Sequence, residues 1–521
     1  MSVARLGRSR GIALTGVTGH VVDVEADIGG GLPNFILLGL PDASLAEARD
    51  RIRSAARNTG IPLSPRRITV NLQPATLPKR GSILDLAIML ATLAAEGLIE
   101  SKNQVVCLGE LGLDGSLRPV PGVLPAVLAG LQAGFHQFVV PEDNVAEARL
   151  VPGAEVRSYR HLADVVEERL VDPALARSLR RSTGGSSDAP EAAPRSEPVP
   201  AARTAGDFAD IRGQQLARFA VEVAAAGRHH LLLRGEPGAG KTMLAERLPT
   251  ILPRLSDQEA METTAIHSVD GSARVTELLR TPPLVAPHHT ATMSALVGGG
   301  SGLPRPGAAS RAHHGVLFLD EAPEFRSGVL DALRQPLESG EISIHRSSGA
   351  ARFPAQFQLL LSANMCPCGR SAAGVTDCDC TPMARRRYFG RLSGPLLDRV
   401  DIQIPVRRVP ASELMSAEAG ESSREIAHRV ATARQQQLDR LTGFGCRTNA
   451  EVPGRLLRGP LAPAAPAVSS VEQAVQRGWL SARGYDRVLR LAWTVADLAG
   501  AGAPTREHVD IALNLRKSEG E

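Results

Sequence analysis

The first third of the chain alternates β-branched apolar runs with longer stretches of helical period. In chain order they lie at residues 21–24, 44–58, 68–72, 84–96, 105–108 and 138–140. Short apolar runs separated by helical patterns are typical of an α/β architecture. The pattern therefore predicts an α/β domain over residues 1–178.

A polar segment separates this domain from the rest of the chain. Residues 181–204 are rich in Ser, Gly, Pro and Ala and have no apolar period, which indicates a linker at 179–205. Beyond it, the apolar runs 231–233, 316–319 and 359–361 are short, continuous and bounded by loop signals. Such runs are typical of buried parallel strands, so we predict a second α/β unit with a parallel sheet.

The period becomes helical near the C-terminus. Apolar side chains share one face of a helix that Ser481 is placed to cap, namely Val488, Leu491, Ala492, Val495, Leu498 and Ala499. We therefore divide the second part of the chain into a core at 206–415 and a helical domain at 416–521.

Composition limits the partners that this chain can bind. Its 521 residues include 59 Lys and Arg against 55 Asp and Glu, so an anionic partner must meet local clusters of charge. With only 11 Phe, 3 Tyr and 2 Trp, rows of rings that stack on bases are not expected. The arginines near the N-terminus precede no apolar segment, and no apolar stretch could span a bilayer. We expect a cytoplasmic protein without a membrane partner.

One motif follows the run 231–233 and fits the pattern G-x-x-x-x-G-K-[ST]. It consists of Gly235, Glu236, Pro237, Gly238, Ala239, Gly240, Lys241 and Thr242. Glycines let backbone N–H groups turn toward phosphate oxygens, and a following helix adds its dipole. Lys241 is expected to bind phosphates and Thr242 to bind Mg²⁺, so the motif predicts a site for ATP and Mg²⁺.

Polar side chains end the two other apolar runs. The run 316–319 leads into Asp320 and Glu321, and the run 359–361 leads to Asn364. Parallel strands present their carboxyl ends at one ligand-binding edge. Asp320 suits a Mg²⁺ ligand, Glu321 a base that polarises the attacking water, and Asn364 a group that orients this water.

These motifs resemble those of the AAA+ ATPases, most closely the magnesium-chelatase-like branch, with the MCM helicases as relatives. Residues 235–242 look like Walker A, 316–321 like Walker B and Asn364 like sensor 1. The segment 394–402 resembles the box that carries the arginine finger of this branch. The resemblance implies that Arg399 acts in the catalytic site of a neighbouring subunit.

The resemblance extends to the segments around the nucleotide base and the lid. Residues 207–211 resemble the segment that contacts adenine, with Ile211 as the contact. Residues 480–484 resemble the start of the sensor-2 helix, which makes Arg483 the candidate. Arg487 and Arg490 share its helix face by spacing, so the choice among the three stays open, with a solvated basic stripe as the other interpretation of the last two.

The whole chain resembles the ComM/YifB family. Its N-terminal domain resembles the Lon-protease-like (ribosomal-S5-like) fold without the catalytic dyad, because Ile83 stands where the serine should be and Leu124 where the lysine should be. A Ser–Lys dyad needs both partners, which argues against peptidase activity. The neighbouring pair Ser82 and Lys79 is the weaker alternative, and a scaffold or DNA-gripping role is favoured.

Four of the six cysteines gather in one loop: Cys366, Cys368, Cys378 and Cys380. Four thiolates close a tetrahedral Zn²⁺ site and leave no open position, so we predict a structural zinc ion. Reversible disulfides or an iron–sulfur cluster fit the same residues and remain open. The histidine pairs at 229–230, 288–289 and 313–314 are interpreted as polar packing or interface hydrogen bonds rather than metal ligands.

Two segments are candidates for contact with a substrate. Residues 287–311 interrupt a helix expected between the first two motifs, and residues 341–353 are typical of a β-hairpin with His345, Arg346 and Arg352 near its tip. By resemblance to MCM-like ATPases both segments face a central pore, where these three residues would contact DNA phosphates. Arginines that are merely solvated are the alternative.

Taken together, the motifs and the resemblance predict a Mg²⁺-dependent ATPase that assembles as a homohexamer, because the finger comes from a neighbour, and acts on single-stranded or branched DNA. The family implies branch migration during homologous recombination in natural transformation. One alternative is a magnesium-chelatase-type motor subunit that remodels a protein partner for metal insertion. Another is a nucleotide-gated interaction protein with slow hydrolysis.

Overall fold

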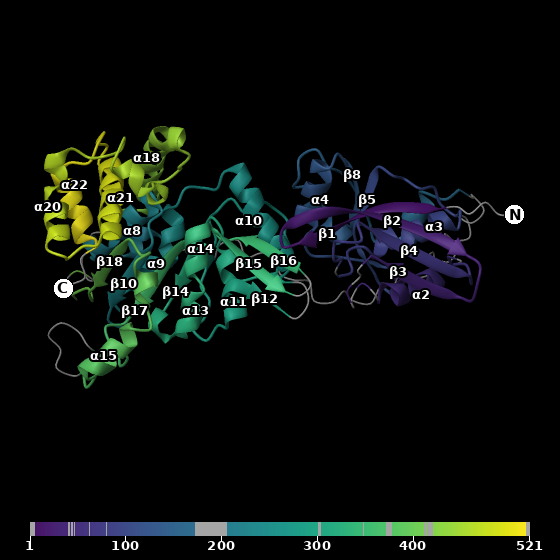
Figure 1. The fold of residues 1–521 in the computed structure, drawn as a ribbon, viewed down its shortest axis with the longest axis horizontal. Helices are drawn as coiled ribbons and strands as arrows, with labels where there is room; N and C mark the ends of the chain where they lie inside the picture. The colour runs from purple at the N-terminus through teal and green to yellow at the C-terminus, as the bar shows by residue number, and fades with distance from the viewer. Residues whose placement is uncertain are drawn as a thin grey trace.

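The computed structural model describes most of the chain: residues 6–171, 206–300, 304–346, 349–370, 378–410, 413 and 420–516, except 40–41, 43–44, 46, 62 and 80. The predicted linker at 179–205, the predicted boundary at 415–416 and the middle of the cysteine loop lie outside the described residues. An α/β domain occupies one end of an elongated molecule, and a second α/β domain with C-terminal helices occupies the other (Figure 1).

The N-terminal domain is built on a seven-stranded sheet in the order β3-β4-β2-β1-β5-β8-β9. These strands are β1 (Gly7–Thr15), β2 (Thr18–Gly29), β3 (Asn34–Leu38), β4 (Arg67–Gln73), β5 (Val105–Cys107), β8 (Gln137–Pro141) and β9 (Glu155–Tyr159). The longer helices are α2 (Ala48–Asn58), α3 (Asp85–Ala95) and α4 (Val123–Gln132). Helix α3 is buried along its whole length because it packs on β1 and β2. The predicted α/β domain is confirmed.

The positions that correspond to the Lon dyad lie in the apolar core. Ile83 and Leu124 are buried, with 7% and 0% of their surface exposed. The Nζ atom of Lys79 donates to the carbonyl oxygen of Leu72 at 3.0 Å, and the hydroxyl of Ser82 donates to Glu110. Because amine and hydroxyl are committed to different partners, Ser82 and Lys79 do not form a dyad.

The second domain contains a five-stranded sheet in the order β11-β14-β17-β10-β18, with every neighbouring pair parallel. Its strands are β10 (Leu231–Gly235), β11 (Leu284–Val285), β14 (Val316–Leu319), β17 (Gln358–Ala363) and β18 (Ile402–Val406). The three apolar runs predicted as buried parallel strands are its central members. Residues of β14 and β17 are buried at every position, which explains their continuous apolar sequence.

Alternate residues of these strands enter two apolar cores. Leu231, Leu233 and Phe318 lie in the core shared with α8 (Gln215–Gly227) and α9 (Lys241–Ile251). The residues between them, such as Leu232 and Leu317, point to the other face of the sheet and lie in a second core. That core is shared with shorter helices, which are α12 (Ala308–Arg311), α13 (Ser327–Asp331), α14 (Arg334–Ser339) and α16 (Gly394–Leu397). The sheet is therefore covered on both faces, as a parallel sheet requires.

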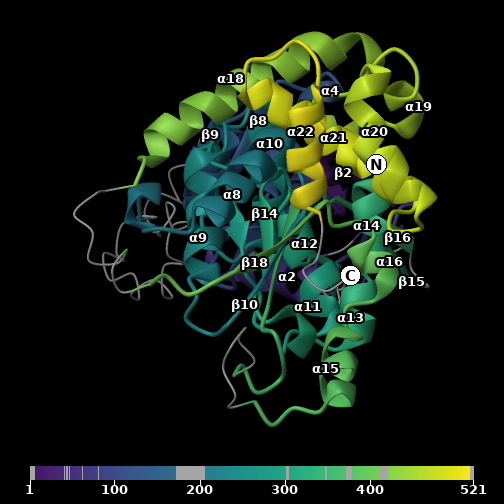
Figure 2. The same ribbon diagram turned by 90° about the vertical axis from the view of Figure 1, so that its left-hand side faces the viewer.

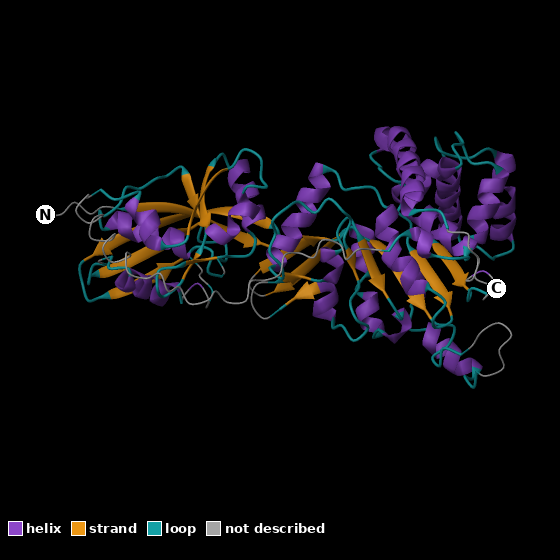
Figure 3. Ribbon diagram, turned by 180° about the vertical axis from the view of Figure 1, so that it is seen from behind, coloured by secondary structure: helices purple, strands orange, loops and turns teal. Residues whose placement is uncertain are grey.

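Helices form the C-terminal end of the molecule (Figure 3). They are α18 (Ser423–Leu441), α19 (Gly454–Leu457), α20 (Ala465–Gln476), α21 (Ala482–Leu498) and α22 (Arg506–Asn514). The Oγ atom of Ser481 accepts the N–H of Gly484 at 3.1 Å, so the predicted cap is confirmed. The apolar face of α21 packs into the core shared with α8 and α9, which joins the helical domain to the sheet. Among the described residues no helix is long and apolar enough to cross a membrane.

Helix α10 (Asp257–Asp270) connects the two domains. The carbonyl oxygen of Ser268 accepts the N–H of Gly122 at 3.0 Å, and the Ser268 hydroxyl donates to the buried carboxylate of Glu147. Burial raises the pKa of Glu147, and the hydrogen bond from Ser268 opposes that rise. Helix α10 lies between the N-terminal domain and β14 in Figure 1, so the two domains meet directly.

Candidate nucleotide site

The P-loop begins where β10 ends and leads into α9. Gly238 and Gly240 have φ angles of +75° and +91°, which only glycine adopts readily. A Cβ atom on Gly235 would lie 2.1 Å from the carbonyl oxygen of Val406, so this position also needs glycine for the close approach of β18. The sequence motif therefore forms the strand–loop–helix unit that binds phosphates in P-loop proteins.

Lys241 joins two of the predicted motifs. Its Nζ atom donates to the carbonyl oxygens of Gly235 at 2.7 Å and Glu236 at 2.8 Å, and to Oδ1 of Asn364 at 3.0 Å. Burial lowers the pKa of Lys241, and the nearby carboxylates of Asp320 and Glu321 oppose this shift. The structure thus brings the Walker A amine to the sensor-1 amide.

Thr242 and Asp320 meet as predicted for a Mg²⁺ site. The Thr242 hydroxyl donates to Oδ2 of Asp320 at 2.9 Å. Neighbouring oxygens around an octahedral Mg²⁺, each about 2.1 Å from the ion, lie about 3.0 Å apart. A hydroxyl and a carboxylate are suitable oxygen ligands, so the spacing and chemistry of this pair fit Mg²⁺.

Glu321 follows Asp320 in a left-handed backbone conformation, with φ at 49° and ψ at 45°. Its N–H donates to Oδ1 of Asp320 at 3.0 Å and to the Ser362 hydroxyl at 3.3 Å, which holds this conformation. The carboxylate is half exposed and lies 3.6 Å from Nδ1 of His289. A non-glycine residue in this conformation is strained, and such strain is common at catalytic positions.

Three residues at the site were missed by the sequence analysis. Ser362 stands two positions before Asn364 at the carboxyl end of β17, a placement that could have indicated a site residue. For His289 the sequence predicted polar packing or interface hydrogen bonds, and no place in the nucleotide site. Gln214 donates from Nε2 to the P-loop carbonyl of Ala239 and to that of Arg407 at 3.2 Å, and no sequence pattern marks it.

Ile211, the predicted adenine contact, lies beside the P-loop core. Only 2% of its surface is exposed, and it shares an apolar cluster with Phe208 and Ala239. The structure thus places the segment 207–211 next to the P-loop, and contact between Ile211 and a base stays a prediction.

Arg399 lies in contacts within its own chain. Its guanidinium forms an ion pair with Glu338 of α14 and donates to the carbonyl oxygen of Pro395. Burial lowers the pKa of Arg399, and the neighbouring cations Arg334 and Arg483 act in the same direction. Action as a finger in a neighbouring subunit would require the pair with Glu338 to open.

The three candidate sensor-2 arginines have different surroundings. Arg487 pairs with Asp401 and donates to the carbonyl oxygen of Arg399 at 3.1 Å. Arg490 donates to the carbonyl oxygen of Val452 at 2.7 Å. Both are fixed by the protein, so the interpretation of a solvated basic stripe is wrong. Arg483 is exposed on the first turn of α21, and its role stays a prediction.

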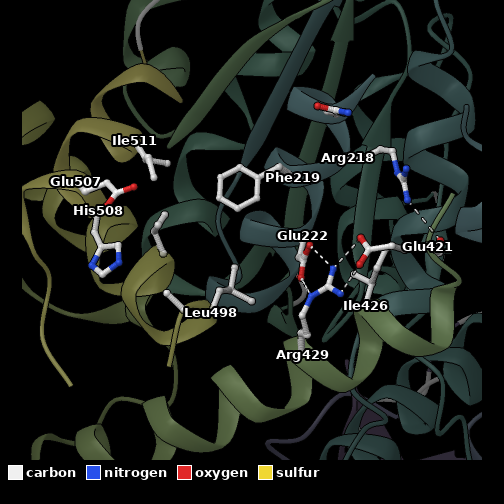
Figure 4. A pocket seen from close by; sticks show the side chains of 13 residues that line it. Arg218, Phe219, Glu222, Glu421, Ile426, Arg429, Leu498, Glu507, His508 and Ile511 are labelled. Carbon is white, nitrogen blue, oxygen red and sulfur yellow. Dashed lines mark hydrogen bonds and ion pairs between the residues drawn. The ribbon is translucent and has the colours of Figure 1, made fainter. Parts of the chain in front are cut away.

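A cavity of about 730 Å³ lies between α8 and the C-terminal helices. Figure 4 shows Phe219, Leu498 and Ile511 around it, and Arg429 bonded to both Glu222 and Glu421 at 2.7 Å. No residue of the P-loop lines this cavity. The nucleotide site is therefore defined by its motifs and their contacts, and this cavity is separate from it.

The cysteines come together as the zinc hypothesis requires. The Sγ atom of Cys366 lies 3.2 Å from that of Cys368 and 3.6 Å from that of Cys378, and all four sulfurs, including that of Cys380, lie within 4.8 Å of one another. Sulfurs that bind one tetrahedral Zn²⁺ at 2.3 Å are about 3.8 Å apart. All four are free thiols in this structure, and the cluster is compatible with a metal ion.

His313 and His314 meet the carboxylate of Glu262 on α10. Nδ1 of His313 accepts the N–H of Gln356 at 3.0 Å, so its hydrogen is on Nε2, which faces Glu262 at 3.6 Å. A nitrogen that carries hydrogen does not bind a metal. Contacts from His313 and His314 hold the pKa of Glu262 at about 2. Burial lowers the pKa of both imidazoles, that of His314 to about 4, so two neutral histidines and one carboxylate form a polar link between α10 and the residues just before β14.

A P-loop on a parallel sheet, with acids and an amide at the ends of the next two strands, defines a P-loop ATPase of the AAA+ class. Three family models match the chain. Residues 24–144 match "Subunit ChlI of Mg-chelatase", 207–414 match "Magnesium chelatase, subunit ChlI", and 420–516 match "Magnesium chelatase, subunit ChlI C-terminal".

Similar proteins cover nearly the whole length. An uncharacterized protein of Mycobacterium tuberculosis is 50% identical over 518 residues, 98% of this chain and 99% of its own. The competence protein ComM of Haemophilus influenzae is 38% identical over 512 residues, and YifB of Salmonella typhimurium is 37% identical over 507, each match covering 97% of this chain and 96% of the relative. The chain belongs to the ComM/YifB family of magnesium-chelatase-like AAA+ ATPases.

The Lon-like character of the chain has separate support. Lon protease 1 of Sorangium cellulosum is 30% identical over 181 residues, which is 33% of this chain and 22% of that protease. Together with the α/β fold of the N-terminal domain, this similarity agrees with the expected Lon-like domain.

Proposed function

We propose that this protein is a homohexameric AAA+ motor that hydrolyses ATP to move DNA, with branch migration as its helicase activity in recombination. The observation that carries the ATPase step is the meeting of Lys241, Thr242, Asp320, Glu321 and Asn364 at one edge of the sheet. Phosphoryl transfer needs mainly positioning and charge stabilisation, and these groups supply both.

Each group has one task in the proposed reaction. Lys241 would exchange its carbonyl partners and Asn364 for phosphate oxygens. Thr242 and Asp320 would hold Mg²⁺, which neutralises phosphate charge when bound. Glu321 would polarise the attacking water from its half-exposed position, and Asn364 would orient it.

Two observations support DNA as the substrate. The predicted hairpin is present as β15 (Glu341–Arg346) and β16 (Gly349–Pro354), and the register pairs Ser343 with Arg352 and His345 with Ala350. His345 and Arg352 are exposed and share a face, although Arg352 lies farther from the turn than expected. The side chain of Arg346 lies outside the described residues. The relative ComM is named as a competence protein, which also favours DNA.

A chelatase-type role is the second candidate, because the three matching family models are named for magnesium chelatase subunit ChlI. In that role the motor would remodel a protein partner for metal insertion. Stimulation of ATP hydrolysis by a protein partner, and not by DNA, would favour it.

Zinc in the cysteine cluster is part of the proposal. Three of the sulfurs, those of Cys366, Cys368 and Cys378, lie 3.2 to 3.6 Å apart, and the sulfur of Cys380 lies within 4.8 Å of them. This spacing supports one structural Zn²⁺ held by the four cysteines. Elemental analysis of purified protein should find about one zinc per chain. Iron with visible absorption would instead indicate an iron–sulfur cluster.

Branch migration of three-stranded DNA by the purified protein tests the motor directly. The expected result is ATP-dependent strand displacement and DNA-stimulated hydrolysis, both abolished in Lys241→Ala. The matched control is Arg280→Ala, which removes an exposed cation paired with Asp257 and should leave both activities intact. ATP hydrolysis without DNA stimulation or displacement would reject the DNA motor.

A further inference from the structure

Helix α15 (Pro382–Phe389) and the cysteine segments before it extend away from the second domain (Figures 1 and 2). We call residues 366–370 and 378–391 the cysteine arm. Its base is fixed to the nucleotide site, because a Cβ atom on Gly369 would lie 2.7 Å from Cγ of Pro237 in the P-loop. Tyr388 and Leu392 are buried at the other end. The arm is therefore a positioned element.

The described residues of the cysteine arm are strongly basic. Asp379 is the one acidic residue among them, and the arginines are Arg370, Arg385, Arg386, Arg387 and Arg391. Four thiolates around one Zn²⁺ would add two negative charges and still leave the arm cationic. In a chain whose formal net charge is +4 over 521 residues, this is a local concentration of positive charge.

Two of these arginines have structural partners. Arg385 donates to the sulfur of Cys378 at 3.4 Å, and Arg391 forms an ion pair with Glu324 at 3.2 Å. Arg370, Arg386 and Arg387 are exposed, and their side chains make no hydrogen bond or ion pair with the described residues. Three guanidinium groups on a fixed arm thus remain available to an anionic partner.

We propose that the cysteine arm binds the phosphodiester backbone of nucleic acid through Arg386 and Arg387, with Arg370 beside the cluster. This inference rests on the proposed DNA activity and adds a DNA contact outside the β15–β16 hairpin. Guanidinium groups bind phosphate oxygens through paired N–H donors. Tyr388 is buried, so the arm offers no exposed tyrosine to stack on bases. We therefore expect the arm to contact phosphates only and to bind nucleic acid independently of base sequence.

Salt dependence of DNA binding tests the arm. Fluorescence anisotropy with a labelled single strand and a forked duplex would compare wild type with Arg386→Ala/Arg387→Ala. Each lost phosphate contact lowers the slope of log affinity against log salt by about 0.7 to 0.9, so we expect a decrease of about 1.5 and several-fold weaker binding. Arg386→Lys/Arg387→Lys should recover most of the slope.

The matched control is Arg254→Ala/Arg424→Ala, which removes two exposed arginines outside the arm. Basal ATP hydrolysis and sedimentation of all variants should equal those of wild type. If Arg386→Ala/Arg387→Ala gives the same salt slope as the control variant, the role of the cysteine arm is overturned while the proposed motor function stands. Loss of the assembled ring with intact DNA affinity would also overturn it, by assigning the arm to a neighbouring subunit. Absence of DNA binding by wild type would reject the proposed motor itself.

Discussion

The hydroxyl of Ser362 donates to the carboxylate of Asp320, and its oxygen accepts the N–H of Glu321. One buried side chain on β17 therefore fixes both acids at the end of β14. Thr242 holds the second oxygen of Asp320 at 2.9 Å, so this carboxylate is oriented from two sides. Preorganised ligands of this kind lower the cost of binding a cation in the required geometry.

Ser362→Ala should weaken the response to Mg²⁺. Loss of a hydrogen bond to a charged group costs about 1.5 to 3 kcal/mol, so the Mg²⁺ concentration for half-maximal ATP hydrolysis should rise about tenfold or more, with a smaller fall in kcat. Ser362→Thr keeps the hydroxyl and should lie closer to wild type. Titration of ATPase activity with Mg²⁺ measures both quantities.

Ser310→Ala is the control for that substitution. Ser310 is also fully buried, but its hydroxyl has no hydrogen-bond partner among the described residues. Its replacement should leave the Mg²⁺ response unchanged. Equal behaviour of the two alanine variants would contradict a positioning role for Ser362.

Glu321→Gln should separate ATP binding from hydrolysis. The amide cannot polarise water as a carboxylate does, so hydrolysis should fall at least about 100-fold, while ATP affinity stays close to that of wild type. Binding of a fluorescent ATP analogue and single-turnover hydrolysis would be measured. Glu324→Gln, on the same turn but paired with Arg391, is the control and should retain activity. An undiminished rate in Glu321→Gln would refute its assigned role.

Arg399→Ala should be inactive alone and rescued by mixing. A subunit with Arg399→Ala keeps its own P-loop, and a subunit with Lys241→Ala keeps its finger. In a mixed ring about a quarter of the interfaces combine both intact parts, so the mixture should regain about a quarter of the wild-type rate. The exposed Arg326→Ala serves as control. No recovery after subunit exchange would argue against action in a neighbouring subunit.

The elements that the sequence predicted well depend on local patterns. The strands β10, β14 and β17 are buried on both faces, so continuous apolar runs mark them. The cap at Ser481 is a contact over three residues. The P-loop is a contiguous motif, and the acids and Asn364 follow strands, so their convergence follows from a parallel sheet.

The contacts that the sequence analysis missed join distant segments. Ser362 and Asp320 are 42 residues apart, and the pair of Arg487 with Asp401 spans 86. Helical spacing placed Arg487 on the same face of its helix as Arg483 and Arg490, but it gave no information about which residues pack against that face. A buried carboxylate held by His229 and Arg487 depends on the docking of α21 against the sheet, which only tertiary packing determines.

Protonation of His230 should lower the free energy of unfolding as the pH falls below about 6.5. Its Nδ1 accepts the N–H of Leu359 at 2.9 Å, and burial lowers its pKa to about 4. The unfolded chain binds this proton near pH 6.5, so the stabilisation is complete above that pH and is lost as pH falls toward 4, by up to about 3 kcal/mol. At pH 5 the loss is about 2 kcal/mol relative to pH 7.

His230→Asn keeps an acceptor for Leu359 and removes the titration. Its free energy of unfolding should therefore change less between pH 7 and pH 5 than that of wild type, by about 2 kcal/mol. Urea unfolding followed by tryptophan fluorescence measures this, since Trp493 lies in α21 and Trp479 lies in the turn between α20 and α21. His136→Asn, on the exposed surface of the N-terminal domain, should keep the wild-type dependence. If His230→Asn keeps it as well, His230 does not stay neutral in the folded protein.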